Sequence, residues 1–435
     1  MSSTLEYAAL LFAVMAVFGY ANHYLLKLPR NSGLLVIALA GSLSLRVIEQ
    51  AFPTVEFATV LRQALDRADF SSLLLNGFLG FLLFSAALQV DVGQLLSRKW
   101  TILTLSTVGV LLSTFVMAAG MFVIFRLVGI EVPASYCLAF GALISPTDPV
   151  TVLGVLSRLR IPASLQVVIG GESLFNDGIG IVLYTIFVHL AVSGGASPTA
   201  SILLLDFLRE AGGGALLGLA GGGIAFAVTG GIDEYNIELM ISLALVTGTF
   251  AIAQRLGVSG PVAVVVAGLL MGSVGARYAV STATHNYLQK FWALVDELLN
   301  SLLFLMIGLE FAVIDLRWSF VGAAALAILL ALAVRGLSIT VASLPLNLGA
   351  PNKLRGVALL TWSGLRGGIS VALALALPHS PYREELVTAC YGIVVFTMIV
   401  QGLSLRRVAS WLYPVPAPSA TAECPRPMAG SDTGL

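Results

Sequence analysis

The sequence predicts an all-α polytopic membrane protein with about 13 transmembrane helices, and three observations carry that prediction. Hydrophobic residues make up 58% of the 435 residues before the 44 glycines are counted, and the mean hydropathy is +0.95. Charged residues are only 11%, against about 25% in ordinary soluble domains. Apolar runs long enough to cross a bilayer recur along nearly the whole chain. A soluble fold of this size cannot bury so much apolar side chain.

Net charge and cysteine content exclude other classes of protein. The chain holds 23 basic and 23 acidic residues, which sum to a formal charge of zero, whereas nucleic-acid binders need a basic surface. Cys137, Cys390 and Cys424 are too scattered for a disulfide framework or a metal-ligand cluster. The apolar spans also offer no pairing of a nucleophile with a base, so we expect neither an enzyme nor a cofactor.

The expected spans are bounded by charged residues or by Pro and Gly. They cover residues 5–26, 31–49, 70–90, 100–128, 134–157, 163–193, 201–230, 236–255, 259–275, 287–311, 318–346, 354–378 and 385–412. Residues 1–413 then form one membrane domain, and residues 414–435, rich in Pro and Ala, form a short disordered cytoplasmic tail. The first span lacks a basic leader and a small-residue cleavage site, so we interpret it as a retained helix.

Lys and Arg in the connections predict an external N-terminus and a cytoplasmic C-terminus. We expect the membrane to be the plasma membrane of a bacterium or an archaeon. In that orientation the cytoplasmic connections hold twelve basic residues and the external connections six, and basic residues favour the cytoplasmic side. The twelve are Lys27, Arg30, Arg98, Lys99, Arg158, Arg160, Arg277, Lys290, Lys353, Arg355, Arg406 and Arg407, and the six are Arg62, Arg67, Arg126, Arg255, Arg317 and Arg383. An odd number of spans places the two termini on opposite sides of the membrane, which fits this orientation.

Two spans are interrupted near their centres. Ser-Pro-Thr-Asp-Pro at 145–149 interrupts one, and Gly-Leu-Arg-Gly-Gly at 364–368 interrupts the other. Interrupted helices at corresponding positions of two halves indicate a transporter site. We expect inverted repeats at about 1–195 and 236–413, joined by the glycine-rich span 201–230, because one linker helix reverses the second half.

Four ionisable residues lie deep in the predicted spans: Asp148, Glu172, Asp177 and Arg366. Each costs at least about 2.5–3.5 kcal/mol to insert, so each needs a partner or a function. Asp148 lies between two prolines, which break the helix and leave backbone carbonyls free near Thr147. Free carbonyls beside a carboxylate suit a small cation. The alternative is a proline kink in which Asp148 only caps the second half-helix, and both interpretations can hold together.

The sequence Gly-Glu-Ser-Leu-Phe-Asn-Asp-Gly at 171–178 carries the densest polar group. Ser173 and Asp177 are four residues apart and share a helix face, and Asn176 is adjacent to that face. Glu172 points well away from Asp177. We infer that Ser173 and Asp177 line a site while Glu172 reaches a neighbouring helix. The alternative is a polar network that only holds helices together.

Arg366 is the basic residue at the centre of its span, and its flanking glycines allow close backbone approach. We expect a buried ion pair between Arg366 and Glu172 that holds the broken helices in register. The three acids outnumber this arginine, so the site favours a cation. Arg335 has no explanation from the sequence, and we place Asp296 and its neighbour Glu297 near a mouth of the pathway.

Three motifs resemble those of the monovalent cation/proton antiporters, in particular the electroneutral Na⁺/H⁺ exchanger branch that includes NhaP. They are Ile-Ser-Pro-Thr-Asp-Pro-Val at 144–150, the sequence at 171–178, and Trp-Ser-Gly-Leu-Arg-Gly-Gly at 362–368. Their order and spacing also fit, and the resemblance covers nearly the whole chain. It implies an inverted-repeat antiporter fold with two crossed discontinuous helices, and a homodimer.

The same resemblance implies roles for single residues. Asp177 is similar to the ion- and proton-binding carboxylate of the family. Asp148, Ser173 and the Thr147 backbone are similar to further ligands of a monovalent cation or to partners linked to it through water. Asn176 resembles a further residue of the ion and proton site, the one that marks the electroneutral branch. Glu172 and Arg366 resemble the buried ion pair of the family. Ser85 departs from the pattern, because many members carry an acid there, and this leaves the charge of the coordination shell open.

We therefore expect a secondary active transporter that exchanges Na⁺, or Li⁺ or K⁺, for H⁺ by alternating access and serves pH homeostasis. One cation or one proton at Asp177 gives electroneutral one-for-one exchange. The alternative is a K⁺/H⁺ antiporter or a cation channel of related architecture, and a channel would pass current without coupling to a proton gradient. An organic-anion transporter would need more central basic residues, and a membrane scaffold leaves two charged helix breaks unexplained.

Overall fold

The computed structural model describes residues 4–51, 70–159, 161–193, 200–230, 234–278, 282–312, 318–346 and 348–414, and every regular element within them is helical. Ten helices there are long and apolar enough to cross a membrane, and Leu73–Leu88 and Gly260–Gly272 are shorter apolar helices. A broken helix at Lys353–Trp362 and Gly368–Leu375 fills the remaining predicted span, so a helix lies in each of the predicted spans. The predicted tail lies outside the described residues except for Pro414.

The first six spans contain the first broken helix. They are α1 (Thr4–Ala21) with η1 (Asn22–Leu26), α2 (Arg30–Ala51), α4 (Phe70–Ser72) with η2 (Leu73–Phe78) and α5 (Leu79–Leu88), α7 (Lys99–Thr104) with η3 (Leu105–Gly109) and α8 (Val110–Leu127), α9 (Ala134–Ile144) with α10 (Pro149–Leu156), and α11 (Ala163–Val192). A short helix, α6 (Val92–Ser97), precedes α7 and begins at the capping residue Asp91.

The remaining spans contain the second broken helix. They are α12 (Ala200–Phe207) with η4 (Leu208–Gly212) and α13 (Gly213–Thr229), α14 (Tyr235–Leu256), α15 (Gly260–Tyr278), α16 (Thr282–Glu310), α17 (Trp318–Ser343), α18 (Lys353–Trp362) with α19 (Gly368–Leu375), and α20 (Arg383–Phe396) with η5 (Thr397–Gln401) and α21 (Gly402–Leu412). The breaks fall in the fifth and twelfth spans, as the sequence predicts. The division into repeats at 1–195 and 236–413 stays a prediction.

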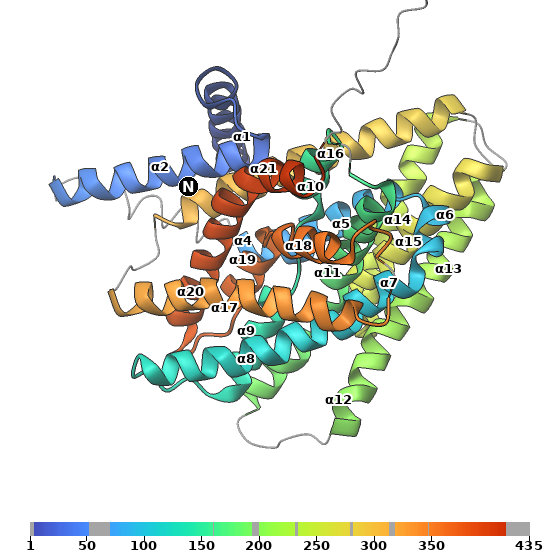
Figure 1. The fold of residues 1–435 in the computed structure, drawn as a ribbon. Coiled ribbons are helices and arrows are strands. Elements are labelled where there is room, and N and C mark those ends of the chain that lie inside the picture. The colour runs from blue at the N-terminus through green and yellow to red at the C-terminus, as the bar shows by residue number, and fades with distance from the viewer. Residues whose placement is uncertain are drawn as a thin grey trace, which may run out of the picture.

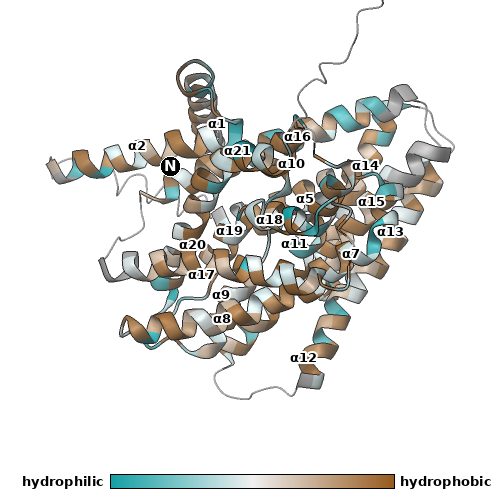
Figure 2. Cartoon of the chain, in the orientation of Figure 1, coloured by the Kyte–Doolittle hydropathy of each residue, from teal (hydrophilic) through white to brown (hydrophobic). Residues whose placement is uncertain are grey.

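The helices pack as two groups, with apolar residues along most of their length (Figure 2). One group holds α5, α13, α14 and α15, and the other holds α8, α9, α17 and α20 (Figure 1). In the first group the glycine stripe of α13 contacts the α15 backbone, since a Cβ on Gly218 would lie 2.3 Å from the Ala263 carbonyl oxygen. This is the close helix approach that small residues at four-residue spacing allow. α11 packs on both α9 and α15, and α16 packs on both α5 and α19, so these two helices connect the groups beside the helix breaks.

Candidate functional site

The two helix breaks contact each other. The backbone N–H of Asp148, in the first break, donates a hydrogen bond to the Leu365 carbonyl of the second break at 2.9 Å. A Cβ on Gly367 would lie 3.0 Å from the Asp148 Cβ, so a larger residue would push the segments apart. The prolines around Asp148 and the glycines around Arg366 therefore place two irregular backbone segments side by side.

Asp148 both caps a helix and faces the site. Its Oδ1 accepts from the Val150 N–H at 2.9 Å, and its Oδ2 accepts from the Thr151 hydroxyl at 2.8 Å. These bonds begin α10, with Pro149 as its first residue. The same carboxylate lines a cavity at the break. The capping role of Asp148 is confirmed, and its role as a cation ligand stays a prediction.

Arg366 satisfies backbone carbonyls that the first break leaves free. Its Nη1 donates to the Ser145 carbonyl at 2.6 Å and to the Pro146 carbonyl at 3.0 Å. A helix that ends inside the membrane needs such donors, because lipid cannot supply hydrogen bonds to its free carbonyls. The guanidinium of one break therefore completes the hydrogen bonding of the other.

The predicted ion pair between Glu172 and Arg366 is wrong, because Glu172 pairs with Arg335 of α17. The two side chains form a bidentate contact, with Nη1–Oε1 at 2.8 Å and Nη2–Oε2 at 2.9 Å. Glu172 is 1% exposed and Arg335 8%. Gly364 makes room for the contact, since a Cβ there would lie 2.6 Å from the Arg335 Nε. The physical reason for the error is that Arg366 donates to the break carbonyls, while α17 presents a second guanidinium in the geometry that a carboxylate favours.

A chain of buried hydrogen bonds connects this ion pair to the first break. Asn176 donates from Nδ2 to the Glu172 Oε1 at 2.9 Å and to the Thr147 hydroxyl at 2.8 Å. The Thr147 hydroxyl also lies 2.9 Å from the Ser173 hydroxyl. The Asn176 Oδ1 accepts from the Thr147 N–H at 3.4 Å. Asn176 and Ser173 of α11 thus hold Thr147 in place.

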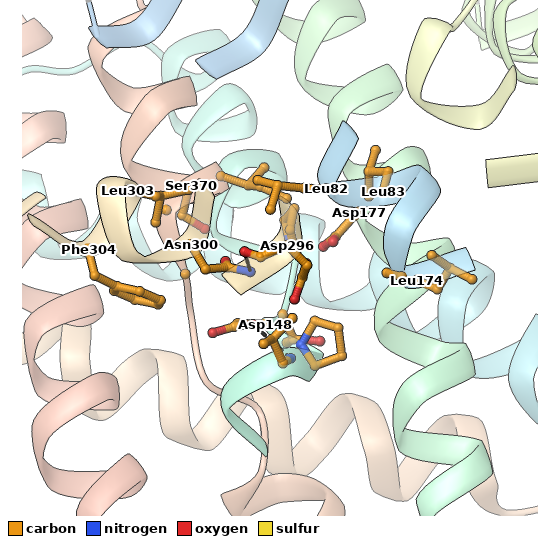
Figure 3. Close-up of a pocket in the computed structure, with 18 residues that line it drawn as sticks. Leu82, Leu83, Asp148, Leu174, Asp177, Asp296, Asn300, Leu303, Phe304 and Ser370 are labelled. Atoms are coloured by element: carbon orange, nitrogen blue, oxygen red, sulfur yellow. Dashed lines mark hydrogen bonds between the residues drawn. The ribbon is translucent and has the colours of Figure 1, made fainter. Parts of the chain in front are cut away.

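Asp177 faces a small buried cavity of about 50 Å³. Thr147, Asp148, Asp296 and Asn300 line the same cavity (Figure 3). Asp177 is 4% exposed, and its Oδ1 is buried without a hydrogen-bond partner. An unpartnered buried carboxylate oxygen is costly unless a proton or cation neutralises the group.

The structure divides the five residues that were predicted for the ion and proton site into two sets. Thr147, Asp148 and Asp177 line the cavity, whereas Ser173 and Asn176 do not and instead contact Thr147. The roles of all five in ion or proton binding stay predictions. Within the described residues, no three His, Cys, Asp or Glu side chains converge closely enough to hold one metal ion.

Sequence reasoning missed Asp296 and Asn300 as residues of the inner cavity. They lie one turn apart on α16, so they share a helix face with Leu303 and Phe304, which also line the cavity. A shared polar face within an apolar helix was the available signal. Sequence reasoning also missed the role of Arg335, because the sequence shows it only as an isolated charge within an apolar span.

Ser85, where the family pattern suggests an acid, does not line the cavity. Its hydroxyl donates to the Trp292 carbonyl at 2.8 Å and so joins α5 to α16. The neighbouring Leu82, Leu83 and Ala86 face the cavity instead. In this conformation the charge of the cavity wall does not depend on position 85.

A wider funnel of about 1080 Å³ adjoins the inner cavity. Val150, Asp296 and Asn300 line both spaces. The funnel wall also holds five basic residues that the charge pattern places in cytoplasmic connections or at their edges: Lys27, Arg30, Arg158, Arg406 and Arg407. The residues around Asp296 therefore form a neck between a basic funnel and the acidic cavity.

Comparisons with known proteins agree with this architecture. Residues 11–411 match the family model described as sodium/hydrogen exchanger, transmembrane. The Na⁺/H⁺ antiporter NhaP of Pseudomonas aeruginosa is 41% identical over 414 residues, which cover 94% of this chain and 97% of that protein. The Na⁺/H⁺ antiporter NhaH of Halobacillus dabanensis is 34% identical over 403 residues, covering 91% and 95%.

A solved structure shares the fold. The sodium proton antiporter MjNhaP1 from Methanocaldococcus jannaschii, determined at pH 8, superposes with a TM-score of 0.72 at 21% identity. The match covers 94% of this chain and 99% of that chain. The all-helical fold with broken helices is therefore an antiporter fold.

Proposed function

Because this chain belongs to the sodium/hydrogen exchanger family, whose members are membrane transporters, we propose that it exchanges Na⁺ for H⁺ by alternating access. The observation that carries this proposal is the Asp177 carboxylate. It is buried, it faces the inner cavity, and its Oδ1 has no hydrogen-bond partner. Neutralisation of Asp177 by either one proton or one cation couples the two ions at a single group.

The charges around the breaks support one-for-one exchange. Asp148, Glu172 and Asp177 contribute three negative charges, and Arg335 and Arg366 contribute two positive charges. These five groups carry one net negative charge, which one proton or one monovalent cation neutralises. Asp296 at the neck lies outside this group and adds a further negative charge when it is ionised.

The protein is an integral membrane protein, and we place it in the plasma membrane of a bacterium or archaeon with its N-terminus outside. The basic funnel then opens to the cytoplasm, so this conformation faces inward. We also propose a homodimer. The windows Ala9–Leu26 and Ser201–Thr229 have only 6% and 22% of their residues buried, which leaves apolar surface for lipid or for a second copy.

The experiment that tests this function is a dye assay of the pH difference across everted membrane vesicles. Na⁺, Li⁺ and K⁺ are added in turn after respiration has acidified the lumen. We expect Na⁺ to dissipate the pH difference with the membrane potential clamped, because exchange at Asp177 moves no net charge. A response to K⁺ alone would favour the K⁺/H⁺ alternative, and no response beyond that of vesicles lacking the protein would contradict exchange.

A further inference from the structure

We propose that Asp296 and Asn300 of α16 form a capture site, where a monovalent cation from the funnel binds before it passes to Asp177. This inference rests on the proposed function and adds a specific step to it. Figure 3 shows the two side chains at the inner cavity with Asp148 and Asp177.

The capture site lies where the funnel meets the inner cavity. Asp296 and Asn300 line both spaces, together with Val150. Asp177 lines the inner cavity and is not part of the funnel wall. A cation that moves from the funnel to Asp177 therefore passes Asp296.

The chemistry of the pair suits a small cation. The Asp296 Oδ1 is buried without a hydrogen-bond partner. Asn300 is 7% exposed, and its Nδ2 donates to the Asp296 backbone carbonyl at 3.0 Å, which fixes the amide one turn from the carboxylate. Carboxylate and amide oxygens are ligands that hard cations prefer.

The capture site and Asp177 are successive positions on the route from the funnel. Asp296 lines both the funnel and the inner cavity, whereas Asp177 lines the inner cavity and not the funnel. Both oxygens of Asp148 already accept hydrogen bonds from the start of α10. A cation at Asp296 therefore lies before Asp177 on the pathway, and it offsets the repulsion between Asp296 and Asp148.

The surrounding charges explain why a capture site is useful. Basic side chains dominate the funnel wall, and they oppose the entrance of a cation. Glu297, the next residue of α16, pairs with Arg30 across the funnel and does not line the inner cavity. Asp296 is thus the carboxylate that the funnel presents at its inner end.

The test compares Asp296→Asn with the matched control Glu297→Gln in proteoliposomes that contain purified protein. Both changes remove one negative charge from neighbouring residues of α16. We expect Asp296→Asn to raise the apparent KM for Na⁺ at least about tenfold, which corresponds to about 1.4 kcal/mol of binding, with the maximum rate changed less than about twofold. Glu297→Gln should change the KM less than about twofold, and Asp296→Glu should recover most of the wild-type affinity.

The measured KM values and maximum rates either support the capture site or overturn it. Equal KM values for Asp296→Asn and Glu297→Gln would overturn it, as would a loss of maximum rate with unchanged KM. If size-exclusion chromatography shows that Asp296→Asn does not fold, Asn300→Ala takes its place, with an expected rise in KM of about threefold and the same contrary outcome. Absence of exchange by the wild-type protein would instead contradict the proposed function, so the two failures are distinguishable.

Discussion

Asp177→Asn is expected to reduce Na⁺-dependent proton flux at least about 100-fold, to the level of empty vesicles. Asparagine keeps the shape of the side chain but carries no charge and binds no proton in this pH range. The Asp177 Oδ1 makes no hydrogen bond that the change would break, so the fold should survive. Flux in proteoliposomes and the elution volume of the purified protein measure the two effects separately.

The matched control is Asp91→Asn. Asp91 is an exposed aspartate that caps α6 by accepting from the N–H groups of Gly93 and Gln94 at 2.8 and 3.2 Å. Asparagine caps helices about as well as aspartate, so exchange should be unchanged. Proton-coupled Na⁺ flux that survives in Asp177→Asn would show that another group couples the ions.

Arg335→Met is expected to give the largest loss of stability among single substitutions at the site. It leaves Glu172 as an unpaired charge that is 1% exposed, and breaking a buried pair in this way costs about 3–5 kcal/mol. The measurement is the temperature at which the detergent-solubilised protein loses its monodisperse elution peak. Addition of Glu172→Gln to Arg335→Met should recover part of the loss, because the unpaired charge is then gone.

A double-mutant cycle distinguishes the two candidate arginines. We expect a strong coupling between Glu172→Gln and Arg335→Met, because the two side chains share two hydrogen bonds. The coupling between Glu172→Gln and Arg366→Met should be smaller, because Arg366 donates to the Ser145 and Pro146 carbonyls. A larger coupling of Glu172 with Arg366 than with Arg335 would instead support the Glu172–Arg366 ion pair that the sequence predicts.

Hydropathy predicts the helices of this fold well, because a segment that crosses the lipid as a single span forms a helix. Each backbone polar group must be satisfied within the segment, so long apolar runs become helices and charged or Pro/Gly residues mark their ends. The two helix breaks are also predictable from the sequence. Pro146 and Pro149 interrupt the fifth span, and the glycines at 364 and 367 favour irregular backbone in the twelfth span. The π-helical turns within several spans have no comparable signal in the sequence.

The candidate site was predictable where its residues share one helix or one break. Thr147 and Asp148 lie in a break, and helical spacing alone relates Ser173, Asn176 and Asp177. Contacts between helices were not predictable in this way. The direction of Glu172 leaves its partner undetermined between two arginines on different helices. The position of Asp296 beside Asp148 in the cavity depends on how α16 packs on α19.

Competition between one Na⁺ and one proton at Asp177 is tested most directly by equilibrium binding of radioactive Na⁺ to the purified protein over a range of pH. If the two ions exclude each other at one carboxylate, the apparent Kd for Na⁺ rises about tenfold for each unit that the pH falls below the range in which Asp177 is ionised. Each bound Na⁺ then releases one proton. A Kd for Na⁺ that stays constant across the acid range would contradict competition at Asp177.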